Sequence, residues 1–248
     1  MSLKREQQGG LLRLTLARPE KRNAFDDAMI AELTAAYRGV DDGVKAVLLQ
    51  AEGSHFSAGA DLGWMQRMAG YSEAENLADA RLLADLMRTI DLCPKPTIAR
   101  VQGSAFAGAV GILACCDLVA AVPEAAFAIS EVRIGLIPAV ISPYLVRAMG
   151  VRQMRRFCLT AESFTAEQAK QMGLVHEVTP DLDGAIGKWL AALDAAMPQA
   201  VAATKDLLRS VDRPLDADII EDTARRIAAQ RVSPAGRAGI AAFLEKRK

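Results

Sequence analysis

Two short segments of small residues could supply backbone amides for chemistry. Residues 55–62, HFSAGADL, place Gly59 and Ala60 before a switch from polar to apolar residues, and residues 103–111, GSAFAGAVG, place Gly108 before an apolar run. Small residues let a ligand approach the main chain, and free N–H groups at a helix start favour negative charge. Two such turns meeting in one pocket would form an oxyanion hole; the alternative is a tight turn between a strand and a helix in each case.

A single carboxylate stands in a third segment, AFAISEVRIGLIPAVISPY, at residues 126–144. Glu131 lies there among apolar or small residues, with Arg133 as its only charged near neighbour. Burial raises the pKa of a carboxyl group toward the range that is useful for proton transfer. Glu131 is therefore a candidate general acid/base. The alternative is a glutamate at a strand end that reaches solvent or pairs with Arg133.

Apolar periodicity predicts the elements that must position these segments. We expect strands at residues 12–16, 44–50, 97–101, 117–122 and 125–130. We expect helices at residues 26–37, from Ser72 to about Asp91, from Ser142 with Pro143 at its first position, and from Thr165. Ser72 with Glu75, and Thr165 with Gln168, have the spacing of capping boxes.

The C-terminal part of the chain differs from the rest. Strand and helix signals alternate to about Val178, and the later pattern is helical only. The helical segments are separated near Pro198, Pro214 and Pro234. We therefore expect an α/β core over residues 1–190 and a C-terminal helical region over residues 191–248. Apolar residues at helical spacing in this region favour burial against a partner subunit, with packing on the chain's own core as the alternative.

The composition excludes several functional classes. The 248 residues carry 30 basic and 30 acidic side chains, which argues against general binding of nucleic acid. No segment has the length and apolarity of a membrane span, so we expect a cytoplasmic protein. The chain has only two histidines, which are few ligands for a zinc site, and we expect no metal site. We expect the cysteines, which show no CxxC spacing, to be reduced and buried: Cys93, Cys115, Cys116 and Cys158.

Four segments carry a family resemblance. HFSAGADL, VQGSAFAGAVG and FAISEVRIGLIPAVISPY, in this order and at this separation, resemble the enoyl-CoA hydratase/isomerase (crotonase) family, and ARPEKRNAFD is similar to that family's opening. The likeness covers essentially the whole chain. It implies an α/β fold, a crotonase-like spiral of ββα units with a C-terminal helical trimerisation region, in which trimers commonly pair into hexamers. It also implies an acyl-CoA substrate, with CoA arriving as part of that substrate and no separate cofactor.

The resemblance also implies roles for particular residues. The two oxyanion amides fall on Ala60 and Gly108, and the acid/base falls on Glu131. The residues implied to bind the CoA part are Lys21, Arg22, Ala58, Asp61 and Leu62. Of these, Ala58 and Leu62 lie at the adenine-binding turn. Lys21 and Arg22 lie where the family often places a cation near the CoA phosphates, with a solvated surface role as the alternative.

Position 111 departs from the family's pattern. The family's well-known hydratases use two glutamates, and the first falls on Gly111 here, whereas the second falls on Glu131. One carboxylate suffices for a Δ3-Δ2 isomerisation. One carboxylate can also catalyse hydration of the double bond by syn addition, if it activates the water and returns the proton to Cα. Resemblance to bacterial methylglutaconyl-CoA hydratase-like members, which also have Gly there, favours the hydratase. The alternatives are an isomerase and a non-catalytic CoA-ester-binding homologue. Arg133 is a candidate to form an ion pair with a distal carboxylate of the substrate's acyl group.

Overall fold

Two β-sheets form the body of the chain in the computed structural model, which describes residues 2–245. The first sheet has the spatial order β1 (Leu3–Gln8), β2 (Leu11–Leu16), β3 (Ala46–Ala51), β5 (Thr97–Val101), β7 (Leu118–Ala121) and β10 (Glu177–Val178). The second has the order β4 (His55–Ser57), β6 (Ser104–Phe106), β8 (Ala126–Ala128) and β9 (Phe164–Thr165). Neighbouring strands pair in parallel except β1 with β2 and β8 with β9.

The strands come in pairs that divide between the two sheets. In β3–β4, β5–β6 and β7–β8 the first strand joins the first sheet and the second strand joins the second sheet, and helices follow each pair. This is the predicted succession of ββα units, and it confirms the predicted fold class. Because β4, β6 and β8 are parallel neighbours, the turns that follow them lie at one end of the second sheet.

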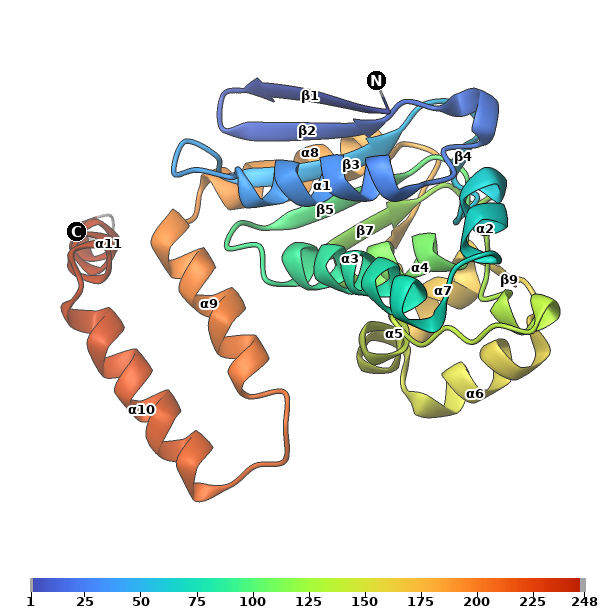
Figure 1. Cartoon of the computed structure of the whole chain (residues 1–248). Coiled ribbons are helices and arrows are strands. Elements are labelled where there is room, and N and C mark those ends of the chain that lie inside the picture. The colour runs from blue at the N-terminus through green and yellow to red at the C-terminus, as the bar shows by residue number, and fades with distance from the viewer. Residues whose placement is uncertain (1, 246–248) are drawn as a thin grey trace.

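Helices enclose the first sheet. The body contains α1 (Asp27–Arg38), α2 (Leu62–Met68), α3 (Glu73–Asp91), α4 (Gly108–Cys115), α5 (Ser142–Met149), α6 (Val151–Thr160), α7 (Ala166–Met172) and α8 (Leu182–Asp194), with the 3-10 turns η1 (Pro19–Lys21) and η2 (Glu131–Ile134). Figure 1 shows α1 and α3 on one face of the first sheet and α8 on the other. Leu182 and Ile186 of α8 pack there against Leu48, Ile98 and Ala120 of the sheet.

The predicted capping boxes are confirmed. The Ser72 hydroxyl accepts from the Glu75 amide at 3.3 Å, and the Glu75 carboxylate accepts from the Ser72 amide at 2.8 Å. Thr165 and Gln168 exchange the corresponding bonds at the start of α7. Each pair satisfies two amides that a helix start leaves unbonded, which explains why these two helix starts could be predicted from the sequence.

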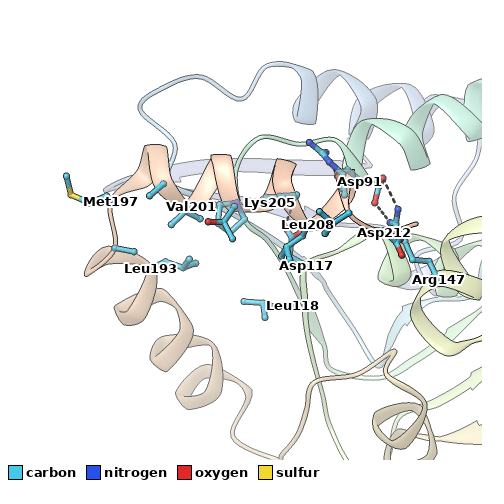
Figure 2. A pocket seen from close by; sticks show the side chains of 16 residues that line it. Asp91, Asp117, Leu118, Arg147, Leu193, Met197, Val201, Lys205, Leu208 and Asp212 are labelled. Atoms are coloured by element: carbon cyan, nitrogen blue, oxygen red, sulfur yellow. Dashed lines mark hydrogen bonds and ion pairs between the residues drawn. The ribbon is translucent and has the colours of Figure 1, made fainter. Parts of the chain in front are cut away.

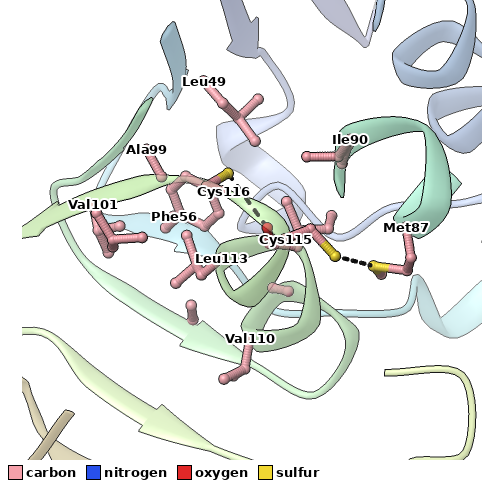
Figure 3. Close-up of a cluster of buried hydrophobic side chains, with 14 of the residues drawn as sticks. Leu49, Phe56, Met87, Ile90, Ala99, Val101, Val110, Leu113, Cys115 and Cys116 are labelled. Atoms are coloured by element: carbon pink, nitrogen blue, oxygen red, sulfur yellow. Dashed lines mark hydrogen bonds between the residues drawn. The ribbon is translucent and has the colours of Figure 1, made fainter. Parts of the chain in front are cut away.

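Helix α4 is the centre of the core. Figure 3 shows its Val110 and Leu113 among apolar side chains of the sheets and of α3, and the Cys115 thiol lies 3.8 Å from the Met87 sulfur. Neither Val110 nor Leu113 is exposed. All four cysteines are free thiols as predicted, but Cys158 is only half-buried. Because α4 is apolar on all sides, its start is held by packing.

The C-terminal helices stand apart from the body. Figure 1 shows α9 (Pro198–Ser210), α10 (Ala217–Val232) and α11 (Pro234–Glu245) extending beyond the sheets as an arm. The predicted helices and their separation at Pro198 and Pro234 are confirmed. The predicted boundary after residue 190 falls inside α8, which still packs on the sheet. In residues 2–245, no helix has both the length and the apolarity to cross a bilayer.

Several elements differ from the prediction, and the short strands β4, β6 and β9 and helix α6 were not predicted. Strand β1 was not expected, because it buries only Leu3 and therefore shows no apolar alternation; backbone bonds to β2 beyond the Gly9–Gly10 turn hold it. Helix α5 begins at Ser142, with Ile141 as the preceding residue, so Pro143 takes the second helical position rather than the first. The Ser142 hydroxyl donates to the Ala139 carbonyl instead of capping the helix.

Candidate active site

The turn after β4 presents the amide of Ala60. Gly59 has a φ of +85°, the region that glycine adopts most readily. The Phe25 amide donates to the Gly59 carbonyl at 2.8 Å, and the Asp61 amide donates to the Phe25 carbonyl at 2.9 Å. These bonds bracket Ala60 and leave its own N–H without a hydrogen-bond partner among residues 2–245. Helix α2 begins only at Leu62, so Ala60 precedes the helix instead of lying in its first turn.

The turn after β6 presents the amide of Gly108. Ala107 has φ +51° and ψ −125°, a strained conformation for a residue with a Cβ, and its amide donates to the Ala128 carbonyl at 2.8 Å. Gly108 is the first residue of α4, as predicted, and within the described part of the chain its N–H also has no partner. The free amide therefore points out of the start of an apolar helix, where the helix dipole favours negative charge.

The two turns touch each other. Strands β4 and β6 are paired neighbours, with Ser57 opposite Ala105. A Cβ added at Gly59 would lie 2.8 Å from the Phe106 carbonyl oxygen and 3.3 Å from the Ala107 Cβ. Glycine at position 59 therefore allows the first turn to close against the second. The structure thus brings together the two segments whose amides the sequence singled out.

Buried polar groups hold the first turn. Asn23 is fully buried with a φ of +53°, and its amide group donates to the carbonyls of Glu52 at 2.7 Å and His55 at 2.9 Å. The Ser57 hydroxyl donates to the Asn23 carbonyl at 2.8 Å and accepts from the Gly59 amide at 3.1 Å. Sequence analysis missed both residues. The one available signal was the tolerance of asparagine for positive φ, which is weak without knowledge of the turn.

Asp61 is the centre of a charge cluster. Its carboxylate caps α2 by accepting from the amides of Gly63 at 2.9 Å and Trp64 at 3.2 Å. It also pairs with Lys21 at 2.9 Å and with Arg18 at 3.3 Å. The hydrogen bond from Lys21 is the main reason that the pKa of Asp61 is lowered. This carboxylate is therefore committed to holding the turn, and its predicted contact with CoA stays a prediction.

The other residues predicted to bind CoA lie beside the same turn. The Ala58 amide donates to the Arg22 carbonyl at 2.9 Å, so these two residues are in direct contact. The side chains of Lys21 and Arg22 are exposed, and Leu62 is 81% exposed. This exposure leaves the Leu62 side chain accessible to a ligand, and its predicted contact with CoA stays a prediction.

Glu131 follows β8 directly, at the start of η2. It is half-buried, its Oε2 atom has no hydrogen-bond partner within residues 2–245, and burial raises the pKa of its carboxyl group. The guanidinium of Arg133 instead donates to the Ala161 carbonyl at 2.7 Å. Pairing with Arg133, the alternative for Glu131, is therefore not what the structure has. The same bond holds Arg133 against the end of α6, which gives its predicted contact with substrate no support.

Glu131 and Gly108 lie at the same end of neighbouring strands. Phe106 of β6 is opposite Ala128 of β8, and each strand leads within three residues to Gly108 or Glu131. The bond from the Ala107 amide to the Ala128 carbonyl ties the two chain segments together at this point. A half-buried carboxylate and two unpaired amides therefore occupy one end of the second sheet.

Position 111 has no room for a side chain. A Cβ added at Gly111 would lie 2.2 Å from the Ile141 Cγ2 atom and 2.6 Å from its Cβ. Ile141 is 2% exposed and fixed at the start of α5. Sequence analysis identified Gly111 but not Ile141, which is 30 positions away in the chain and meets Gly111 only through the packing of α5 on α4.

A cavity of about 910 Å³ lies elsewhere, between α9 and the body. Figure 2 shows that apolar side chains of α9, including Val201 and Leu208, face it together with charged groups. The charged groups are paired: Lys205 with Asp117 and Arg147 with Asp91. None of the residues predicted to bind substrate lines this cavity.

Comparison with known proteins gives the following relatives. The model of the enoyl-CoA hydratase/isomerase family matches residues 6–248. The 2,3-dehydroadipyl-CoA hydratase of Escherichia coli K12 is 33% identical over 247 residues, covering 97% of this chain and 94% of that protein. Enoyl-CoA hydratase AKT6-1 of Alternaria alternata is 35% identical over 251 residues, covering 98% and 81%. The crystal structure of an enoyl-CoA hydratase from Shewanella pealeana superposes with a TM-score of 0.97 at 44% identity, covering 99% and 94%.

Proposed function

The chain belongs to the enoyl-CoA hydratase/isomerase family, and from this premise we propose that it adds water across the α,β double bond of an acyl-CoA thioester. The observation that carries the proposal is that two turns in contact with each other each carry an unpaired amide, at Ala60 and at Gly108. Both residues are only half-buried, so the two donors are accessible, and two free donors on neighbouring turns can bind one ligand oxygen.

The amides would stabilise the charge that develops during the reaction. Attack on Cβ of an α,β-unsaturated thioester turns the acyl group into an enolate, and negative charge collects on the thioester oxygen. Amides of Ala60 and Gly108 that both donate to this oxygen stabilise the transition state more than the ground state. Loss of one such donor typically lowers kcat by about 100- to 1000-fold. Glycine is required at position 108 because an added Cβ would lie 2.7 Å from the Cζ atom of the Phe25 ring.

Glu131 would carry the proton. Its carboxylate accepts a proton from water while the water oxygen bonds to Cβ, and the resulting carboxylic acid then gives a proton to Cα as the enolate collapses. Water is consumed, and Glu131 returns to its starting state. A pKa raised by burial supports both half-steps, because it makes the carboxylate a stronger base near neutral pH.

One carboxylate also suffices for the second candidate function, a Δ3-Δ2-enoyl-CoA isomerase. Ile141 occupies the space beside Gly111, so position 111 contributes no acid or base. Glu131 alone could then move a proton between C4 and C2 of the acyl chain. This observation favours the isomerase, whereas the printed names of the relatives favour the hydratase. A methylglutaconyl-type or other branched acyl group remains part of the proposal for the hydratase.

The CoA part would lie across the first turn. Lys21 and Arg22 supply positive charge for its phosphates, and Ala58 and Leu62 offer backbone and apolar contacts for its adenine. Asp61 orients Lys21 through their ion pair and in this way contributes indirectly. CoA enters as part of the substrate, and the proposed reaction needs no separate cofactor.

A substrate panel tests the proposal. The protein is incubated with crotonyl-CoA, methylglutaconyl-CoA and a 3-enoyl-CoA in water labelled with oxygen-18. Label in a 3-hydroxyacyl product establishes a hydratase, and a shifted double bond without label establishes an isomerase. Turnover of none of them with retained binding would instead indicate the non-catalytic CoA-ester binder.

Glu131→Gln is the matching variant. We expect kcat to fall by about 1000-fold or more with CoA-ester binding retained, because the amides remain in place. Burial raises the pKa of Glu131 in the folded protein, so its ionisation opposes folding increasingly as pH rises from the unfolded value of about 4.3 through the folded value. The variant should therefore melt at a higher temperature than the unsubstituted protein at pH 7, and the difference should vanish toward pH 4. Unchanged turnover would exclude Glu131 as the acid/base.

We propose that the C-terminal arm makes the subunit contacts of a homotrimer, which could pair into a hexamer. Large apolar side chains are exposed along it, among them Leu208 at 62%, Leu215 at 77% and Ile220 at 60%. The cavity under α9 adds further uncovered apolar surface. Analytical ultracentrifugation should give a particle mass that is three or six times the chain mass of 26.5 kDa. Leu208→Asp should lower that mass, whereas Leu77→Asp, exposed on α3, serves as the control.

A further inference from the structure

Phe25 is in contact with both turns that carry the unpaired amides. Its main chain pairs with the first turn, through the bonds to Gly59 and Asp61 on either side of Ala60. Its ring faces the second turn, because a Cβ added at Gly108 would lie 2.7 Å from the ring Cζ atom and 3.4 Å from Cε2. One residue therefore contacts both turns, by backbone bonds on one side and by ring packing on the other.

The ring of Phe25 is itself held in place. It is 2% exposed, and the Trp64 ring of α2 packs against it with centroids 6.3 Å apart and planes tilted by 54°. Trp64 is 3% exposed, and its indole N–H donates to Asp79 of α3 at 3.1 Å. The Phe25 ring is thus confined between α2 and the start of α4 and cannot move away from Gly108 without displacing a second buried ring.

We propose that Phe25 is a positioning residue that sets the spacing between the amides of Ala60 and Gly108. The inference rests on the proposed function, since it requires that both amides bind one oxygen atom. Its physical basis is that a hydrogen bond weakens steeply with distance and angle, so a shift of one donor by a fraction of an ångström reduces the charge stabilisation.

The side chain of Phe25 can be changed without touching its backbone bonds. Phe25→Leu keeps the pairing with Gly59 and Asp61 but removes the ring atoms that face Gly108. The amide of Ala60 should then stay in place while α4 shifts toward the space that the ring leaves. Gly108→Ala does the reverse, because its Cβ collides with the ring and moves the amide outward. In the double variant the new methyl group occupies the space of the missing ring atoms.

The test is a double-mutant cycle on the full-length protein with the enoyl-CoA that the unsubstituted protein hydrates or isomerises. We expect kcat to fall about 10-fold for Phe25→Leu and about 100-fold for Gly108→Ala, with KM within about 3-fold. The double variant should recover most of the loss caused by Gly108→Ala. Phe164→Leu is the matched control: it shortens another buried ring, 1% exposed, on β9. It should lower stability without lowering kcat.

A spectroscopic readout separates positioning from folding. Bound 4-dimethylaminocinnamoyl-CoA absorbs at longer wavelength when its carbonyl is polarised by hydrogen bonds. We expect this shift to shrink in Phe25→Leu and in Gly108→Ala and to return in the double variant. Equal shifts in all variants, or additive losses of kcat, would overturn the role of Phe25 and leave the proposed function intact. No shift and no turnover in the unsubstituted protein would overturn both.

Discussion

The turns that carry Ala60 and Gly108 present the same group by different means. The first turn is held by polar side chains: Ser57 and Asn23 bond to its backbone, and Asp61 ties it to two cations. The second is held by apolar packing of α4 and by one strained residue, Ala107. An unpaired amide can thus be fixed in place either by hydrogen bonds to its neighbours or by filling the space around it.

The difference teaches which perturbations each turn should resist. Hydrogen bonds and ion pairs respond to pH and to the loss of single polar atoms. Packing responds to volume and is indifferent to pH. Gly59 and Ala107 both have positive φ, yet only Gly59 is the residue type that this conformation favours. Three substitutions make the comparison sharper.

Gly59→Ala should have the largest effect. The added Cβ would meet the Phe106 carbonyl oxygen at 2.8 Å in a backbone conformation that already disfavours side chains. We expect a loss of about 3 kcal/mol in the free energy of unfolding, measured in urea, and a fall in kcat of about 100-fold or more. The control is Gly9→Ala, which also has a positive φ, +58°, but open space around it in the turn between β1 and β2, and which should cost about 1 kcal/mol. Equal losses for the two variants would contradict the close contact of the turns.

Asp61→Asn should have an intermediate effect that depends on pH. Asparagine still caps a helix, so the variant chiefly removes charge. The pKa of Asp61 is lowered in the folded protein, so its contribution is present above the unfolded value of about 3.9 and is lost as pH falls through the folded value. We expect a loss of about 1 kcal/mol at pH 7 that fades toward pH 3, read from melting curves across pH. A loss independent of pH would argue against the ion pairs with Lys21 and Arg18.

Ala107→Gly should have the smallest effect and the opposite sign. Glycine adopts this positive φ without strain, and the gain slightly exceeds the extra entropy of glycine in the unfolded chain, so the free energy of unfolding should rise by about 0.5 kcal/mol at every pH. A looser turn should lower kcat by about 3-fold. Urea unfolding at two pH values together with kcat checks both expectations. A destabilised variant would mean that the conformation of Ala107 carries no strain.

Sequence analysis succeeded where a short stretch contains its own signal. The capping boxes at Ser72 and Thr165, and the alternating burial of β2, depend on neighbours in the chain and were predicted correctly. Glu131 could be singled out because its surroundings in the chain are apolar. Strand β1 could not be predicted, since an exposed edge strand held by backbone bonds needs no apolar pattern.

The sequence by itself determined that two turns of small residues lie between strand and helix signals. It also determined that Glu131 is the only carboxylate in an apolar segment, because residue size, charge and periodicity are local properties. Only the tertiary structure decided that the turns touch, that Phe25 contacts both of them, and that Ile141 closes the space at Gly111. These contacts join residues far apart in the chain. They exist because parallel pairing of β4, β6 and β8 brings the C-terminal ends of these three strands to one edge of the sheet. Close packing of the side chains then fixes the positions of the turns that follow.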